Sequence, residues 1–202
     1  MSKHDSIDIS VDIKAVTEGL ERKQRNMGKA INATVSDFGR RGHGWVSQEV
    51  RKVYGVDATR IKDDYKGPKK KGTVKVGGVK IDNVQLKYKG RLLTITHFKM
   101  TPKTRPSKPY QVKAAVIKGV KKVVGKSVFL APTKKKNEDG TIEDGKIIAW
   151  RRTGAERLMI MPIKAISSEQ MITSERTQPG IQKRISGELK KRWDHNVDRF
   201  DK

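Results

Sequence analysis

The chain has no cysteine, which excludes disulfide bonds and metal sites built on thiolates. Aromatic residues make up only 5% and apolar residues 34% of the 202 residues, so we expect a small core with long exposed segments. No apolar run approaches the roughly eighteen residues that a membrane-spanning helix needs, and residues 1–5 lack a signal-peptide pattern. The sequence therefore predicts a protein without a membrane partner, made and kept in a cytoplasm-like setting.

Acidic residues are also in short supply. Lys and Arg outnumber Asp and Glu by 46 to 22, which gives a formal net charge of +24, and no acidic residue occurs between Asp82 and Glu138. An unbroken positive field of this kind attracts polyanions. We therefore expect the partner to present negative charge.

The middle of the chain holds the clearest strand patterns. Apolar and polar residues alternate from Tyr110 to Val116, and a short apolar run at residues 127–132 is stopped by Pro132. Apolar segments at residues 147–150 and 157–162 flank a polar connection, like the two arms of a hairpin. These patterns predict an antiparallel sheet as the core of the protein.

Turn residues divide the segments on either side of this sheet. Alternation from residue 73 to residue 95 predicts a meander whose turns are Gly77-Gly78, Asp82-Asn83 and Lys89-Gly90. Residues 66–72 are typical of a basic linker, and the three prolines within residues 102–109 indicate a loop or extended arm. Residues 133–145 are expected to form a second loop, mobile when no partner holds it.

Helical spacing occupies both ends of the chain. After a strand-like alternation at residues 7–13, apolar residues recur three, four or seven apart along most of the run to residue 53. Four glycines interrupt this run: Gly28, Gly39, Gly42 and Gly44. Each weakens a helix by about 1 kcal/mol relative to alanine, which favours two helices with a break or kink. Asp57 is a candidate cap for a short helix that runs through Ile61 and Tyr65.

The C-terminal helix has the most regular pattern. Pro179 suits its first turn. An apolar residue recurs every four positions at Ile181, Ile185, Leu189, Trp193 and Val197, and Phe200 follows three residues after Val197. If Trp193 is buried in this stripe, its replacement by alanine is expected to cost about 3 to 5 kcal/mol.

Together these patterns predict an α+β fold with one antiparallel sheet, flanked by two N-terminal helices and a long C-terminal helix, with extended loops. We expect a single domain over residues 1–202 that is helical at 13–65, mainly β at 73–165 and helical again at about 178–200.

Motifs for chemistry are largely absent. Residues 119–127 resemble a phosphate-binding P-loop, but five residues separate Gly119 from Gly125 where the motif needs four, and a strand pattern follows instead of a helix. The four histidines lie far apart in sequence, and we expect His97 to be a sheet residue with a satisfied ring. The sequence predicts no catalytic residue, no metal, no cofactor and no enzymatic activity.

Lysine clusters are the candidate functional residues. They fall at expected turns, loop ends or linkers, where they are able to neutralise phosphates or an acidic protein neighbour without reading bases. The competing interpretation is an ordinary solvated surface, and the few aromatic residues are not placed among the lysines as stacking platforms. The candidates are Lys69, Lys70, Lys71, Lys118, Lys121, Lys122, Lys134, Lys135 and Lys136.

The order of several short motifs resembles a known family. The motifs are LTITHFKMTP at residues 93–102, YQVKA at 110–114, VFLA at 128–131, WRRTG at 150–154, RLMI at 157–160 and SEQM at 168–171. In this order, before a long charged helix, they resemble the minor tail protein Z family of tailed bacteriophages. Two departures are Leu158-Met159-Ile160, where the family has Leu-Pro-Ile, and residues 166–168, where it has Gly-Pro-Ser.

The resemblance implies a virion protein that completes the tail at its head-proximal end, after a period in the host cytoplasm during assembly. It further implies a homo-oligomeric neck ring, a hexamer in the family, whose partners are the tail terminator, the tail tube protein and the head-tail connector. Double-stranded DNA would pass through the channel. The alternative is a free, sequence-nonspecific nucleic-acid-binding protein, and a third class, with less support, is a nuclease or nucleotide-using enzyme.

Overall fold

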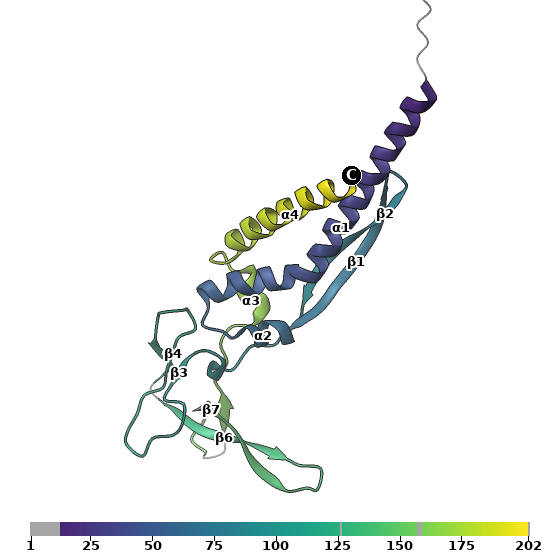
Figure 1. Ribbon diagram of the computed structural model, residues 1–202. Helices are drawn as coiled ribbons and strands as arrows, with labels where there is room; N and C mark the ends of the chain where they lie inside the picture. The colour runs from purple at the N-terminus through teal and green to yellow at the C-terminus, as the bar shows by residue number, and fades with distance from the viewer. Residues whose placement is uncertain (1–12, 126, 157–158, 202) are drawn as a thin grey trace, which may run out of the picture.

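The computed structural model describes residues 13–125, 127–156 and 159–201. The molecule is long and narrow, with helices and a two-stranded hairpin at one end and two small sheets at the other (Figure 1). Of the strand predicted at residues 7–13, residues 7–12 lie outside the described residues, and Ile13 already begins a helix.

Helix α1 (Ile13–Val53) runs for 41 residues. The predicted division into two helices is wrong, although the helix bends along its length as Figure 1 shows. Its glycines have a different role from the one the sequence indicated. Gly28, Gly39 and Gly42 all lie where the neighbouring hairpin approaches the helix, so they permit close packing and do not interrupt the hydrogen bonding.

That hairpin consists of β1 (Tyr65–Val76) and β2 (Val79–Tyr88). The predicted turn at Gly77-Gly78 is confirmed, and both glycines have positive φ. The predicted meander is wrong, because β2 continues through Asp82-Asn83 and residues 89–93 form no strand.

The predicted linker at residues 66–72 is also wrong, because these residues belong to β1. Packing on α1 explains the longer strand. The Tyr65 ring stacks on His43 with centroids 4.7 Å apart, and Pro68 lies beside Gly39. The short helix α2 (Ala58–Asp63) follows Asp57 as predicted, but it ends before Tyr65 and the Asp57 side chain makes no capping hydrogen bond.

Helix α4 (Gln178–Phe200) confirms the predicted C-terminal helix, with Pro179 in its first turn. It packs antiparallel to α1 (Figure 1). A buried hydrogen bond from Asn196 Nδ2 to Thr34 Oγ1 (3.1 Å) joins the two helices. Trp193 is only partly buried, unlike Ile181 at the start of the stripe, so the condition set for a cost of about 3 to 5 kcal/mol is not met.

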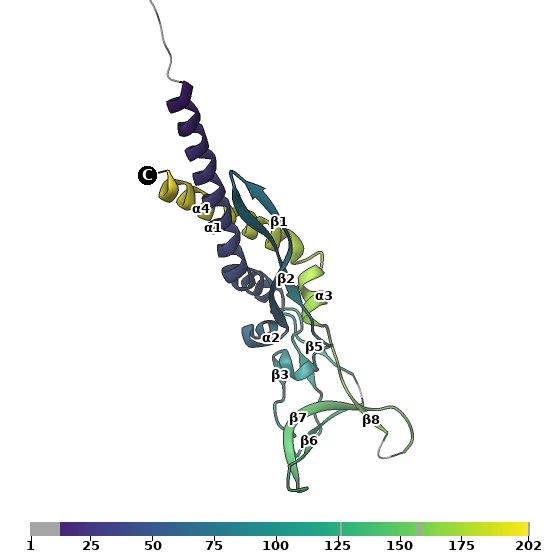
Figure 2. The ribbon, with the colours of Figure 1, turned by 90° about the vertical axis from the view of Figure 1, so that its right-hand side faces the viewer.

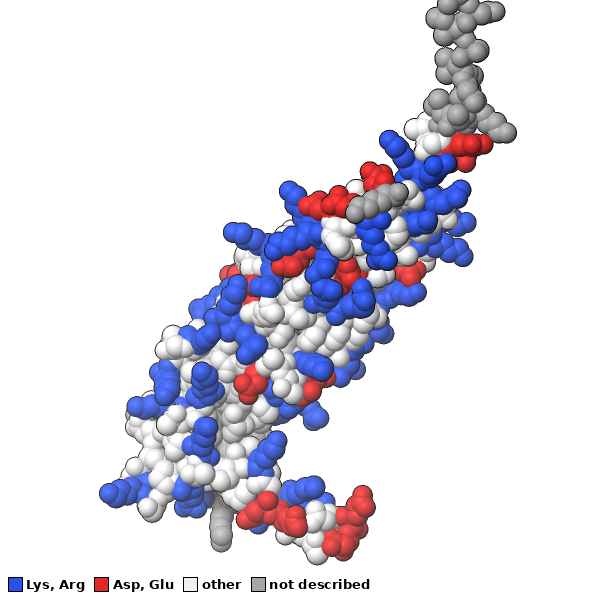
Figure 3. Space-filling model, viewed as in Figure 1, with Lys and Arg blue, Asp and Glu red and all other residues white. Residues whose placement is uncertain are grey.

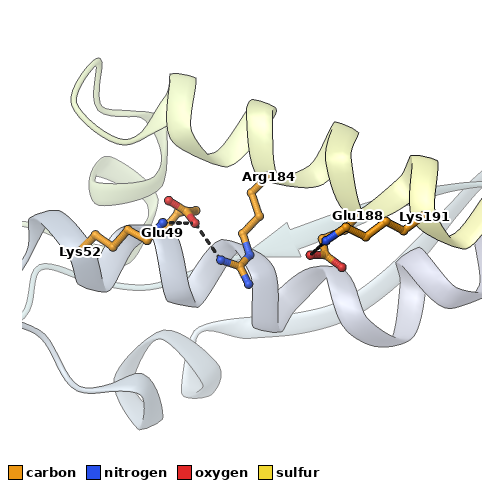
Figure 4. A network of polar contacts seen from close by, with 5 residues as sticks. All are labelled: Glu49, Lys52, Arg184, Glu188 and Lys191. Atoms are coloured by element: carbon orange, nitrogen blue, oxygen red, sulfur yellow. Dashed lines mark hydrogen bonds and ion pairs between the residues drawn. The ribbon is translucent and has the colours of Figure 1, made fainter.

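An ion pair also joins α4 to α1. Arg184 Nη1 donates to Glu49 Oε1 at 3.0 Å, and Lys52 donates to the same oxygen at 2.7 Å (Figure 4). Burial by itself would raise the pKa of Glu49, but the hydrogen bonds from Lys52 and Arg184 outweigh it and hold the pKa below its ordinary value. Glu49 is therefore ionised at neutral pH.

The other end of the molecule contains two three-stranded antiparallel sheets. The first sheet follows the 3-10 turn η1 (Ile95–His97). Its three strands are very short: β3 (Met100–Thr101), β4 (Lys113–Ala114) and β5 (Lys122–Val123). The second is longer: β6 (Val128–Lys136), β7 (Ile142–Arg152) and β8 (Ile160–Pro162). The predicted hairpin between β7 and β8 is confirmed, with Trp150 opposite Pro162.

Two predictions about this end need correction. Residues 133–145 do not form one long loop, since β6 and β7 extend into them and leave a turn at residues 137–141. Pro132 does not end its strand, because β6 is an edge strand with a register shift just after this residue.

Buried side chains form two clusters, one at each end. The first includes Val50, Phe98 and Met171, and the second includes Val112, Leu130 and Ala149. Val116 and Ala165 pack against both clusters. The short helix α3 (Ser168–Thr173) leads into α4, with a capping box between Ser167 and Gln170. The α+β fold with long terminal helices is confirmed, but the described strands form three separate sheets instead of one.

Candidate interaction surfaces

Strand β8 presents apolar side chains to solvent. Ile160 and Met161 of this strand are 36% and 45% exposed, and Met159, just before it, is 52% exposed. Neighbouring strand residues point to opposite faces, so β8 is uncovered on both faces, and within the described residues it pairs only with β7. Figure 2 shows it at the outside of the lower sheet. An apolar edge strand of this kind favours contact with another chain.

A cleft lies beside this strand. It has a volume of about 530 Å³, and its wall includes Met161, Ile163 and Val128 together with Arg151 and Lys164. Apolar walls with two cationic side chains suit a protein segment that carries acidic residues.

Lys134, Lys135 and Lys136 lie at the end of β6, not in a loop. Residues 134–144 hold these three lysines and four acidic residues, Glu138, Asp139, Glu143 and Asp144, so the hairpin tip carries a net charge of −1. Lys134 Nζ pairs with Asp144 Oδ1 at 2.5 Å, and Lys135 lies opposite Glu143. Figure 3 shows the resulting acidic patch at the tip. The tip is therefore locally balanced in charge.

Lys118, Lys121 and Lys122 lie between β4 and β6. Lys118 stands in a turn, where Gly119 has a φ of +84°, and Lys122 begins β5. All three are exposed, and among the described residues none has an ion-pair partner. No acidic side chain of the described residues therefore offsets the positive charge of these three lysines.

Lys69, Lys70 and Lys71 are exposed on β1, where Lys70 pairs with Asp82 of β2. Two of the lysine groups thus lie on different sheets, and the third lies in and just before β5 of another sheet, so the structure does not gather them on one continuous strand ladder. Sequence reasoning missed three further lysines of the same hairpin, Lys75, Lys80 and Lys87, because single lysines in an alternating pattern resemble an ordinary solvated face.

Features that would indicate catalysis are few in the described part of the chain. His97 belongs to the 3-10 turn and not to a sheet, and burial together with the nearby Arg60 and Lys146 lowers its pKa. The P-loop-like segment runs from β5 into β6, and its Lys126 lies outside the described residues. Residues 13–125, 127–156 and 159–201 bring together no group of three histidine or acidic side chains able to hold a metal ion.

Comparisons with family models, with curated proteins and with solved structures found no match to this chain. Within the described residues, no helix combines the length and the apolar character that crossing a membrane requires.

Proposed function

We propose that the chain is a structural virion protein of a tailed phage. In this role it completes the tail at the head-proximal end and forms a homo-oligomeric neck ring, where tail terminator, tail tube and connector meet around the DNA. The order of motifs that resembles the minor tail protein Z family supports this proposal. The single structural observation that carries it is the apolar edge strand β8, uncovered on both faces.

The edge supports an assembly role for a physical reason. An apolar strand at the edge of a sheet invites uncontrolled association unless a specific partner covers it. Full burial of an exposed side chain of this size contributes about 1.5 to 3 kcal/mol, and Ile160 and Met161, already more than half covered, contribute a part of that each. The flexible thioethers of Met159 and Met161 also fit irregular partner surfaces well.

The alternative function is a free, sequence-nonspecific nucleic-acid-binding protein, and the net charge of +24 favours it. The two functions differ in what β8 does. A neck component needs this strand for assembly, whereas a free DNA-binding protein works as a monomer with β8 exposed.

The test is the double variant Ile160→Glu with Met161→Glu, whose carboxylates would stand opposite Arg152 and Arg151, compared with Leu20→Glu on α1. Leu20 is 56% exposed and lies at the opposite end of the molecule from β8. We expect the β8 variant to keep its thermal stability but to lose at least about tenfold in self-association by light scattering. Phage that depend on this variant should give unjoined heads and tails. Normal assembly and titre with the folded β8 variant would overturn the proposal.

A further inference from the structure

The β1–β2 hairpin carries an unusual imbalance of charge. Its residues 65–88 include one aspartate and seven lysines, which are Lys66, Lys69, Lys70, Lys71, Lys75, Lys80 and Lys87. The one acidic residue, Asp82, forms an ion pair with Lys70 and accepts a hydrogen bond from the Thr73 hydroxyl. Among the described residues the other lysines have no acidic partner.

The two faces of the hairpin differ. Ile81, Val84 and Leu86 point toward α1, and the last two touch Gly39 and Gly42. Lys80 is exposed beside the buried Ile81, and Lys75 stands directly opposite Lys80, so both point away from α1. Lys69, which lies opposite Gln85, faces outward as well. One face is thus apolar and docked, and the other is cationic and exposed.

Edge protection alone does not explain this face. Lysines on an edge strand do discourage unwanted strand pairing, but Lys75 and Lys80 form a like-charged cross-strand pair, which destabilises a hairpin. The pair therefore lowers the stability of the hairpin while it concentrates positive charge on this face.

The hairpin is also held rigidly. Gly77 lies against the backbone of Gln24, and Gly28 lies against the carbonyl of Val76, so the distal end of the hairpin is fixed to α1. With a rise of about 3.3 Å per residue, its ten to twelve residues span roughly 33 to 40 Å. This length is close to one turn of duplex DNA, about 34 to 36 Å.

We propose that the outer face of the β1–β2 hairpin is a contact surface for the phosphate backbone of double-stranded DNA. This inference rests on the proposed neck function, since it identifies DNA as the partner of Lys69, and it adds Lys75 and Lys80 to the surface. Lys70 is not part of it, because this residue stands opposite Val84 and pairs with Asp82. Ammonium groups bind phosphates as point charges and do not discriminate bases. The contact is sequence-independent, as passage of a whole genome requires.

The test is duplex binding by the whole protein, followed by fluorescence anisotropy at salt concentrations between 50 and 200 mM. The test variant is Lys69→Gln with Lys75→Gln and Lys80→Gln. The matched control is Lys183→Gln with Lys190→Gln and Lys191→Gln on α4, which removes the same charge from exposed positions outside the hairpin. Glutamine and lysine have similar helix propensities, so the control leaves α4 intact.

Affinity for DNA falls as salt rises, and each phosphate that the protein neutralises adds about 0.9 to the steepness of log affinity against log salt. Since the hairpin variant lacks three lysines, we expect its plot to be less steep by about 2 to 3. The control should change the steepness by less than about 1, and two duplexes of unrelated sequence should behave alike. Equal losses in both variants would show that only total charge matters and would overturn the inference. An unchanged hairpin variant, or a wild-type protein that binds no duplex at any salt, would overturn it too.

These outcomes are separate from the test of the neck function. If the hairpin variant binds DNA normally while the β8 variant fails to assemble, only the DNA surface is wrong. If the hairpin variant loses DNA binding while the β8 variant assembles normally, the neck function fails and the free DNA-binding protein replaces it.

Discussion

Gly28 of α1 lies against the main-chain carbonyl of Val76, so close that a Cβ at residue 28 would stand 2.3 Å from the carbonyl oxygen. No side chain fits in this space without a shift of the hairpin. The contact fastens the distal end of β1 to the helix, and it explains why a residue that weakens helices occurs within α1.

Gly28→Ala should therefore destabilise the protein by about 1 to 3 kcal/mol, because the added methyl group forces the backbones apart. The control is Gly44→Ala, where the added Cβ meets nothing within 4 Å and should stabilise α1 by up to about 1 kcal/mol. Urea denaturation measures both variants. Equal changes of the same sign would mean that the hairpin does not pack on Gly28 as described.

The α1 glycines also show where sequence reasoning stops. Apolar spacing predicted the helical character of α1 and the whole of α4, because that spacing depends only on local geometry. Whether a glycine breaks a helix or admits a neighbour depends on what packs there, and the partners of Gly28 lie some fifty residues away in sequence. For the same reason, residues 66–72 resembled a linker until Tyr65 and Pro68 were seen to dock on α1.

The Glu49–Arg184 ion pair predicts a second measurable effect. Glu49→Ala leaves the Arg184 guanidinium without its carboxylate and should cost about 1 to 3 kcal/mol. Arg184→Ala should cost less, because Lys52 still pairs with Glu49. A double-mutant cycle by urea denaturation gives the coupling between Glu49 and Arg184. A coupling near zero would show that the pair does not hold α4 against α1.

The same carboxylate predicts a pH dependence. The pKa of Glu49 is lower in the folded protein than in the unfolded chain. Its contribution to stability is therefore fully present above the ordinary glutamate pKa, about 4.3, and is lost as the pH falls through the lowered folded value. The stability difference between the wild type and Glu49→Gln should shrink over that range. A difference that stays constant down to strongly acidic pH would contradict the assigned contacts.

The apolar stripe of α4 predicts a graded response along the helix. Ile181 is 7% exposed in the first core cluster, so Ile181→Ala should cost about 2 to 5 kcal/mol. Trp193 is partly exposed, and Trp193→Ala should cost clearly less than the 3 to 5 kcal/mol typical of a fully buried aromatic residue. Thermal denaturation of both variants checks the order. A larger loss at Trp193 would mean that it is covered by another subunit.

Absence of nucleotide turnover is a further prediction. The P-loop-like segment has the wrong spacing and leads into β6 instead of a helix N-terminus, so the backbone amides that cradle a phosphate are not assembled there. Purified protein should hydrolyse neither ATP nor GTP in a phosphate-release assay. Turnover that disappears in Lys126→Ala would contradict this prediction.

The candidate sites were only partly predictable from sequence. Lysine runs are visible in any sequence, but the residues that face them are not. Asp144 and Glu143 of β7 stand opposite Lys134 and Lys135 of β6, and Lys134 pairs with Asp144. The apolar run at residues 157–162 was predicted as a hairpin arm of the core sheet. Its exposure emerges only from the order β6-β7-β8, which leaves β8 at the edge.

The most direct test of the neck function is the position of this chain in intact particles. Cryo-electron microscopy of phage particles that contain a tagged copy should locate it as a ring at the head-tail junction. We expect the β8 edge at a protein interface and the outer face of the β1–β2 hairpin toward the DNA channel. Particles that are complete and infectious but contain no copy of the chain, or contain it elsewhere than the neck, would contradict the proposal.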